Sequence, residues 1–344
     1  MSEGYPVAVI GCGRMGRLHA RVYSRMAKTE RSVNLVGVFD ASHDAAAEVA
    51  EEFDTAHLKS LDEVFSKAKA VSIAVPTQYH HQVALAAMDR GIACLIEKPL
   101  AKTLKECQEI VAAARRTGAV VQVGHIERFN PAVLAMSRLS ISPQFIEVTR
   151  ISPLSFRSID VGVVLDMMIH DIDIVLNLAK SEVVKVDAVG VGVIGAGSEG
   201  EVAEDVCNAR LIFASGCVAN LTASRLALKT ERRLRIFSGD AYVSLDYQKK
   251  YGVVARKGGN LQAIRDAVDR IRKGEIEDLS QLNYQELVQV EELKIDDVEP
   301  LKAELDSFVA AAQGKAEVLV TAEQGLAAVE LAQRIVSAMP KMMV

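Results

Sequence analysis

The sequence predicts an α/β protein of two domains, in which a parallel sheet covered by helices precedes an α+β domain with a large, mostly antiparallel sheet. Three observations predict it. Strand-like runs alternate with helical stretches over the first 125 residues, and a glycine-rich turn follows the first run. Beyond Gly124 the strand-like segments lengthen and few helices separate them. We therefore expect one domain over residues 1–124 and another over 125–344, whose final helix is able to pack back on the first.

The first domain alternates strands and helices in order. The apolar, β-branched runs expected as strands cover residues 7–11, 33–40, 70–77, 92–99 and 119–125. Helical stretches follow the glycine-rich turn through Met26 and cover residues 45–53, 81–91 and 104–118. Gly91 and Gly118 close two of them, as glycine commonly does. Strands separated by such helices indicate parallel βαβ units with both sheet faces buried.

The second domain carries fewer helical signals. Helices are expected at residues 131–139, 163–178, 300–312 and 321–339, the last capped by Thr321. Strand-like segments cover residues 145–152, 183–194, 206–224, 231–247 and 252–258. Residues 195–201 are expected as a turn or loop, and the polar stretch 255–295 has no assignment from the sequence. Successive strands with few intervening helices favour an antiparallel sheet.

Composition narrows the class of protein. Half of the residues are hydrophobic and a quarter are charged, as in ordinary globular proteins. No apolar run approaches the roughly 18 residues of a membrane span, and the N-terminus lacks a secretory signal pattern. A net charge of -5 disfavours a duplex nucleic-acid partner. Five scattered cysteines without C-x-x-C spacing indicate buried thiols in a reducing compartment. We expect a cytoplasmic protein without a membrane or nucleic-acid partner.

The glycine-rich turn has the spacing of a dinucleotide-binding motif. Its six residues Gly11, Cys12, Gly13, Arg14, Met15 and Gly16 match G-x-G-x-x-G. The glycines permit a tight turn, close approach to a pyrophosphate and close helix packing, and the helix N-terminus favours the anion. Asp40 ends the next strand, 24 residues after Gly16, where a carboxylate binds the adenosine ribose. It would repel a 2′-phosphate, and Ser42 follows where an NADP enzyme often has arginine, so we expect NAD over NADP.

Two groups of residues have side chains suited to catalysis. Glu97-Lys98-Pro99 closes the strand 92–99, at the sheet edge where ligands bind, so Lys98 is expected at the reactive end of the cofactor. Asp166 and His170 share a helix face through their i, i+4 spacing. A carboxylate beside an imidazole orients it as a general base. One histidine with Asp166, Asp171 and Asp173 also suggests a metal site, but further ligands are lacking in the sequence nearby, so we expect no metal.

The motifs GCGRMG, VPTQYHH, EKP, GHIERFNP and DMMIHDID occur in this order, and the chain resembles the Gfo/Idh/MocA oxidoreductase family over nearly its whole length. The resemblance implies a Rossmann domain, a second domain with a large sheet, hydride transfer between NAD(P) and a sugar or cyclitol carbinol, and a dimer or tetramer. It also implies catalytic roles for Lys98, Asp166 and His170. The residues it places at the nicotinamide cofactor are Pro76, Thr77, His80, Glu97, Lys98 and Pro99, with Thr77 standing where many members have asparagine.

The segments GHIERFNP and RSIDVGVVLDMMIHDID resemble the branch of the family that oxidises UDP-N-acetylglucosamine at C3. Substrate contacts are then expected from His125, Arg128 and Asn130, and from Arg157, which suits a diphosphate. A dehydrogenase of free sugars or cyclitols, such as inositol, is the alternative on the same scaffold. A dinucleotide-sensing regulator without catalysis is the third, and the presence of both catalytic constellations disfavours it.

Overall fold

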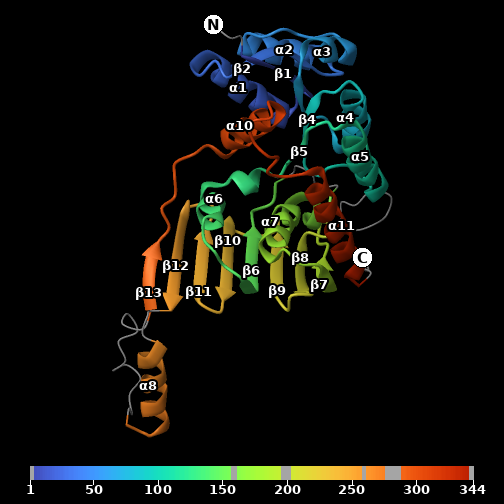
Figure 1. Ribbon diagram of the computed structural model, residues 1–344. Coiled ribbons are helices and arrows are strands. Elements are labelled where there is room, and N and C mark those ends of the chain that lie inside the picture. The colour runs from blue at the N-terminus through green and yellow to red at the C-terminus, as the bar shows by residue number, and fades with distance from the viewer. Residues whose placement is uncertain (1–3, 156–160, 195–202, 258–260, 276–287, 341–344) are drawn as a thin grey trace. The chain divides into compact units, whose positions relative to one another are not determined.

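The computed structural model describes residues 4–155, 161–194, 203–257, 261–275 and 288–340 (Figure 1). The chain forms two compact units, one of residues 1–130 with 298–333 and one of residues 131–297 with 334–344. The first unit therefore continues to Asn130 and includes a C-terminal segment.

The first unit holds a five-stranded parallel sheet in the order β2-β1-β3-β4-β5. Its strands are β1 (Tyr5–Ile10), β2 (Val33–Phe39), β3 (Ala70–Ile73), β4 (Ala93–Glu97) and β5 (Val121–Gly124). Its helices before residue 130 are α1 (Arg14–Thr29), α2 (His43–Phe53), α3 (Leu61–Lys67), α4 (His80–Met88) and α5 (Leu104–Thr117). The predicted Rossmann architecture is confirmed. The strand order reverses beside β1, where such sheets bind their ligands.

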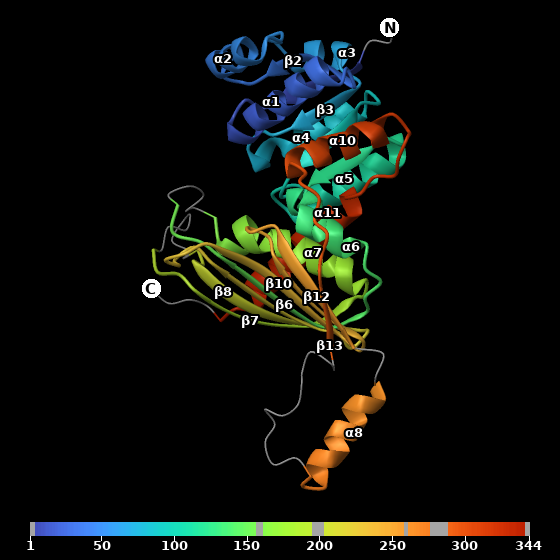
Figure 2. The same cartoon turned by 90° about the vertical axis from the view of Figure 1, so that its left-hand side faces the viewer.

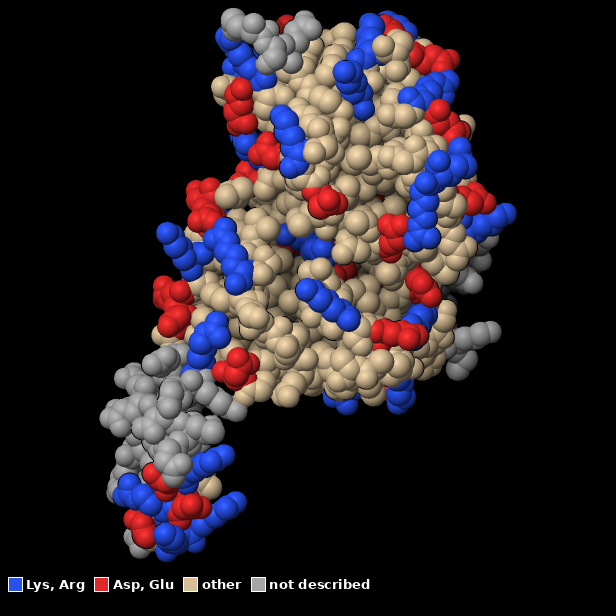
Figure 3. All heavy atoms as spheres, in the orientation of Figure 1, with Lys and Arg blue, Asp and Glu red and all other residues tan. Residues whose placement is uncertain are grey.

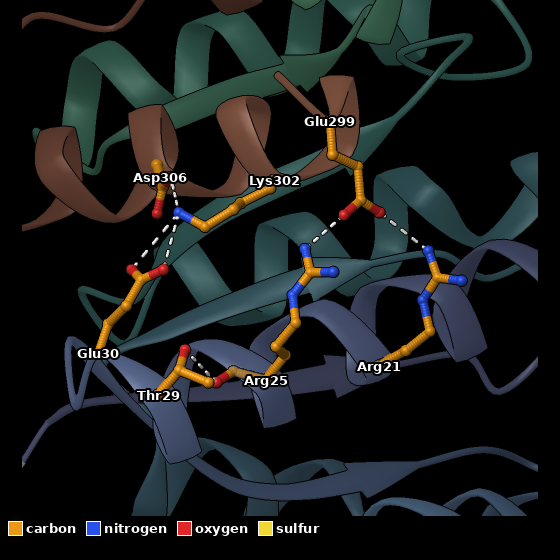
Figure 4. A network of polar contacts seen from close by, with 7 residues as sticks. All are labelled: Arg21, Arg25, Thr29, Glu30, Glu299, Lys302 and Asp306. Carbon is orange, nitrogen blue, oxygen red and sulfur yellow. Dashed lines mark hydrogen bonds and ion pairs between the residues drawn. The ribbon is translucent and has the colours of Figure 1, made fainter. Parts of the chain in front are cut away.

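The helix α10 (Pro300–Ala312) joins the first unit because its apolar face completes the core there. Leu305 and Phe308 are fully buried in the same cluster as Val7 and Tyr23. Ion pairs then connect its polar rim to α1 (Figure 4): Glu299 binds Arg21 and Arg25. Lys302 binds Glu30 at 3.1 Å and Asp306 at 2.6 Å, and Thr29 donates to the Arg25 carbonyl at the end of α1.

The chain after α10 runs along the edge of β5. The amide of Val123 donates to the carbonyl of Val320 at 2.9 Å. The helix α11 (Ala322–Ala338) follows, and Thr321 caps it as predicted, because its hydroxyl accepts from the Gln324 amide at 3.3 Å. Residues of α11 up to Gln333 belong to the first unit and those from Arg334 to the second.

The second unit holds an eight-stranded sheet in the order β13-β12-β11-β10-β6-β9-β8-β7, antiparallel except for the β6–β9 pair. Its strands are β6 (Pro143–Ile151), β7 (Val183–Val191), β8 (Val206–Phe213), β9 (Val218–Ser224), β10 (Glu231–Ser238), β11 (Ala241–Asp246), β12 (Tyr251–Lys257) and β13 (Val288–Glu292). The predicted large, mostly antiparallel sheet is confirmed.

One face of this sheet is buried. Ile146 and Val148 of β6 and Leu234 and Ile236 of β10 are at most 1% exposed. The helices α6 (Pro131–Ser137) and α7 (Ile169–Ala179) lie on one face of the sheet in both views (Figures 1 and 2). The stretch without a sequence assignment contains α8 (Leu261–Arg272) and β13, while the turn expected at 195–201 lies outside the described residues.

The five cysteines are free and buried, as the sequence predicts. Burial raises the pKa of Cys94 to about 12. Within the described ranges, no helix is both long and apolar enough to span a membrane. Lysine and arginine are interspersed with aspartate and glutamate over the face drawn in Figure 3.

Candidate active site

The glycine-rich turn connects β1 to α1, and its glycines have different structural roles. Gly11 has a φ of +98°, and a Cβ there would lie 2.5 Å from the Ala74 carbonyl oxygen. A Cβ on Gly16 would lie 1.7 Å from the carbonyl oxygen of Gly11. The close backbone packing therefore requires glycine at both Gly11 and Gly16. Gly13 is exposed, and apart from Gly13 itself and its two chain neighbours, no described residue has an atom within 4 Å of where its Cβ would be. This leaves open space before the first amides of α1, where Arg14 is exposed and Met15 half-buried.

Asp40 lies directly after β2 and is tied to this turn. Its Oδ2 accepts a 2.6 Å hydrogen bond from the Cys12 amide, and its Oδ1 accepts a 2.8 Å bond from the Ser42 amide. Since a carboxylate has about four lone-pair sites, Asp40 keeps acceptor capacity for hydroxyl groups of a ligand. The side chain is half-buried and faces no arginine or lysine in the described contacts.

The arrangement fits a dinucleotide. Open space at Gly13 lies before a helix N-terminus, which suits a pyrophosphate. The Asp40 carboxylate, held beside it through Cys12, suits the adenosine ribose. Both features lie at the carboxyl edge of the parallel sheet, beside the point where the strand order reverses.

The loops after β3 and β4 are joined by His80, which is 1% exposed. Its Nδ1 lies 3.0 Å from the carbonyl oxygen of Pro99 and its Nε2 lies 2.9 Å from that of Val75. Burial lowers the pKa of His80, and the two carbonyls oppose that effect. Next to these contacts, Pro76 is exposed and Thr77 begins the short 3₁₀ turn η1 (Thr77–Tyr79). His80 thus fixes the backbone on both sides of the expected nicotinamide site.

Lys98 follows β4 directly, is half-buried, and precedes Pro99 through a cis peptide bond. Behind it, the Glu97 side chain folds back so that its Oε2 accepts from the Lys98 amide at 3.3 Å. Gly124 of β5 pairs with Glu97 of β4. The absence of a side chain at Gly124 makes room for the Glu97 carboxylate, because a Cβ there would lie 3.1 Å from it. His19 Nε2 lies 3.0 Å from Glu97 Oε1. The Glu97 carboxylate is therefore held inward, and Lys98 is the outer member of the pair.

The segment after β5 contains three residues that the sequence assigns to substrate. His125 is 1% exposed at the carboxyl edge of the sheet. Arg128 is 7% exposed and donates to the Leu319 carbonyl at 3.2 Å, which ties the turn η2 (Ile126–Phe129) to the chain before α11. Asn130 donates to Glu127 at 3.2 Å and is half-buried. Arg157 lies outside the described residues.

In the second unit, Asp166 and His170 occupy the start of the helix expected over 163–178. Residues Val164–Met168 form a π-helical turn, η3, and α7 continues from Ile169. The wider π turn is a difference from the regular helix that the sequence predicts, and such turns are frequent at functional sites. Both side chains are half-buried, whereas Asp171 and Asp173 are 2% exposed.

Asp171 is accounted for by the fold. It forms a two-point ion pair with Arg150 of β6, at 2.6 Å and 2.9 Å, and both side chains are buried. This pair fixes α7 to the sheet. It distinguishes Asp171 from Asp166 in the DMMIHDID motif.

A buried network that the sequence analysis missed anchors the start of η3. The Glu204 carboxylate accepts from the Val164 amide at 2.9 Å, and a Cβ on Gly162 would lie 2.2 Å from it. Next along the chain, Asp205 accepts from Arg225 at 2.6 Å, and Arg225 also donates to the Val161 carbonyl at 2.8 Å. An acid pair before a strand carried no recognisable motif, so sequence reasoning had no signal for it.

Comparisons with known proteins agree with this geometry. Residues 5–125 match the model of an oxidoreductase family described as an NAD-binding Rossmann fold, GFO_IDH_MocA, and residues 153–243 match that family's C-terminal domain. The UDP-N-acetylglucosamine 3-dehydrogenase of Acidithiobacillus ferrooxidans is 36% identical over 280 residues, 78% of this chain and 86% of that protein. A solved structure of that dehydrogenase has a TM-score of 0.83 at 30% identity and covers 98% of both chains. An inositol 2-dehydrogenase of Rhizobium meliloti is 26% identical over 345 residues, covering 95% of this chain and 94% of that one.

Proposed function

The chain belongs to the Gfo/Idh/MocA family of NAD(P)-dependent oxidoreductases, and from that premise we propose that it oxidises the C3 hydroxyl of UDP-N-acetylglucosamine with NAD⁺. The choice of substrate is based on the similarity to the Acidithiobacillus enzyme, because this similarity extends well beyond the length of the first unit alone. The dinucleotide, when bound, accepts the hydride from the substrate carbon.

The preference for NAD⁺ rests on Asp40. Its carboxylate is fixed beside the glycine-rich turn by the Cys12 and Ser42 amides. Hydroxyl groups of an adenosine ribose can donate to it, whereas a 2′-phosphate would bring a second negative charge against it. Ser42 has a neutral side chain, which already accepts from the Ala45 amide as the cap of α2.

We assign the proton of the substrate hydroxyl to His170, with Asp166 as its orienting partner. Imidazole has an ordinary pKa of about 6.5 and lysine one of about 10.4, so histidine is the better base near neutral pH. Lys98 then binds and polarises the same hydroxyl. The buried contacts of His80 with the Pro99 carbonyl and of Glu97 with the Lys98 amide support this role of Lys98, since they fix the backbone at the end of β4.

His125 and Asn130 are proposed as substrate contacts, and Arg157 as a contact to the diphosphate. Arg128 has its NH2 group committed to the Leu319 carbonyl. For Arg128, this bond favours a role in holding the η2 turn over one in direct contact with the sugar.

We further propose a cytoplasmic homo-oligomer, formed through the sheet face opposite α6 and α7. Val189 and Val191 of β7 are 60% and 55% exposed. Phe237 of β10 is 41% exposed and packs edge-on against Phe145, 5.9 Å between ring centroids. Exposed apolar side chains in such numbers suit a protein–protein contact. Light scattering on the purified protein measures its mass, and a monomer at micromolar concentration would contradict the proposal.

The substrate is tested by following reduction of NAD⁺ with UDP-N-acetylglucosamine, myo-inositol and free N-acetylglucosamine in parallel. The proposal predicts turnover with the nucleotide sugar at least 100-fold above the other two in kcat/KM, or about 2.7 kcal/mol of transition-state binding. Turnover confined to inositol or the free sugar would assign the chain to the alternative suggested by the Rhizobium relative. Bound NAD⁺ without any turnover would indicate a dinucleotide-sensing regulator.

A further inference from the structure

Three ionisable side chains meet in the interior of the first unit behind Lys98. They are His19 of α1, Glu97 of β4 and Glu304 of α10, whose potential ligand or proton-sharing atoms all lie within 4.8 Å of one another. His19 and Glu304 are fully buried and Glu97 is 8% exposed. Nothing in the proposed reaction uses Glu304.

Glu304 lacks the partners that buried carboxylates require. Neither of its oxygens has a hydrogen-bond partner among the described residues. An isolated buried carboxylate costs far more free energy than a buried neutral acid, so such a group takes up a proton instead. Burial, together with the negative charge of Glu97, raises the pKa of Glu304 well above its ordinary value.

Glu97 has the opposite environment. Burial would raise the pKa of its carboxyl, but the hydrogen bond from His19 and the positive charges of His19 and Lys98 outweigh this and lower it. His80 adds a smaller effect in the same direction. Two carboxyl groups this close cannot both ionise without cost, and their surroundings direct the negative charge to Glu97.

The fold holds Glu304 in this position. The ion pairs of Glu299 with Arg21 and Arg25, and of Lys302 with Glu30, fix α10 along α1 (Figure 4). On the inner side, the carbonyl of Glu304 accepts a 3.1 Å hydrogen bond from the buried Gln122 side chain of β5. Tyr23 of α1, also fully buried, is another titratable group on this side, and it donates to or accepts from Ser72 at 3.0 Å, whereas Asp306 lies on the rim with Lys302.

We propose that Glu304 is a neutral carboxylic acid that keeps its proton and donates a hydrogen bond through it to the Glu97 carboxylate, and that it acts as a positioning residue for the end of β4 that carries Lys98. The spacing of up to 4.8 Å is closed by one water molecule or by a small rotation of the Glu304 side chain. Glu97 then has His19 on one oxygen and, on the other, the Lys98 amide. The positioning role rests on the proposed function of Lys98, whereas the protonation of Glu304 does not.

The protonation is tested without substrate. Infrared difference spectra of the wild type and Glu304→Gln at pH 7 are expected to contain the carbonyl band of a protonated carboxylic acid that only the wild type has. Glu330→Gln, which changes an exposed carboxylate on α11, is the control and leaves that band in place. A wild type without the band would overturn the proposal.

The pH dependence of folding stability is a second test of the protonation, and its direction is fixed by the raised pKa. The pKa of Glu304 is raised in the folded state, so the folded chain holds a proton that the unfolded chain releases above the ordinary pKa of 4.5. The folded state of the wild type therefore loses stability as the pH rises from there towards the folded pKa. Relative to the wild type, Glu304→Gln gains up to about tenfold in its folding equilibrium constant per pH unit over this window. A difference that does not vary with pH would overturn the proposal.

The same three side chains could instead hold a divalent cation, which requires an ionised Glu304. Elemental analysis of the purified protein decides this: one equivalent of zinc or manganese, lost in Glu304→Gln, would contradict the neutral acid. The proposal predicts less than a tenth of an equivalent and no change in melting temperature with a chelator.

The positioning role is tested in turnover with UDP-N-acetylglucosamine and NAD⁺. Glu304→Gln keeps a donor of the same shape and is expected to retain kcat within about threefold. Glu304→Leu removes the donor, and about a tenfold loss of kcat with unchanged NAD⁺ affinity is expected for one lost hydrogen bond to a charged group. Equal activity in both variants would contradict the role, while an inactive wild type with the infrared band would contradict only the proposed substrate.

Discussion

The main-chain amide of Cys12 donates a 2.6 Å hydrogen bond to the Asp40 carboxylate. The glycine-rich turn after β1 and the acid after β2 are therefore linked directly. A substitution at Asp40 acts both on the turn and on the ribose that we expect it to bind, so the replacement must keep the acceptor while removing the charge.

Asp40→Asn is such a replacement. We expect it to weaken NAD⁺ binding roughly 10- to 100-fold, as the loss of a hydrogen bond to a charged group does. Binding of NADP⁺ should improve relative to NAD⁺, because the repulsion of the 2′-phosphate is gone. Dissociation constants for both dinucleotides measure the ratio, with Asp44→Asn on the exposed first turn of α2 as the control. An NAD⁺/NADP⁺ ratio equal to the wild type in Asp40→Asn would refute this role.

Alanine substitutions at Gly13 and Gly16 are expected to have different effects, the first on NAD⁺ binding and the second on folding stability. A Cβ on Gly16 would overlap the Gly11 carbonyl oxygen at 1.7 Å, so Gly16→Ala is expected to lower the free energy of unfolding by about 3 kcal/mol or more. Gly13 faces open space, so Gly13→Ala should fold with a normal melting temperature and lose the thermal stabilisation by NAD⁺. Thermal unfolding with and without NAD⁺ measures both. If Gly13→Ala were stabilised as much as the wild type, the pyrophosphate could not lie there.

Asp171 should matter for stability. Breaking its buried pair with Arg150 by Asp171→Ala leaves an arginine without this partner, and a loss of about 3–5 kcal/mol is expected. Asp187→Ala removes an exposed pair with Lys185 and should cost at most about 1 kcal/mol. Urea unfolding compares the two variants. Similar midpoints would show that the buried pair does not anchor α7.

Lys98→Met tests the proposed polarising group. It should lower kcat at least about 100-fold, the lower end of what positioned proton-transfer groups contribute. The affinity for NAD⁺ should remain close to the wild-type value, because the glycine-rich turn and Asp40 are untouched. Lys102→Met, an exposed lysine four positions further on, is the matched control. Wild-type turnover in Lys98→Met would remove this residue from the mechanism.

The sequence predicted what local patterns determine. Gly11, Gly16 and Asp40 could be found because a turn, a helix start and a strand end each need particular residues within a short stretch. The cap at Thr321 and the helix from Pro300 were predicted for the same reason.

Long-range partners could not be predicted in this way. His19 and Glu97 are 78 positions apart and meet only when α1 packs on the sheet. Glu304 reaches them because the apolar face of α10 belongs to the core of the first unit, which no motif in that helix reveals. At the start of the π turn Val164–Met168, the Val164 amide donates to Glu204, a contact made from 40 residues away.

The central claim is that the hydride leaves C3 of a UDP-linked sugar. It is tested most directly by incubating the protein and NAD⁺ with UDP-N-acetylglucosamine deuterated only at C3 and analysing the reduced nicotinamide by mass spectrometry. Our account predicts one deuterium per reduced dinucleotide and a slower reaction than with the unlabelled sugar. Reduced dinucleotide without deuterium, or no reduction at all, would contradict it.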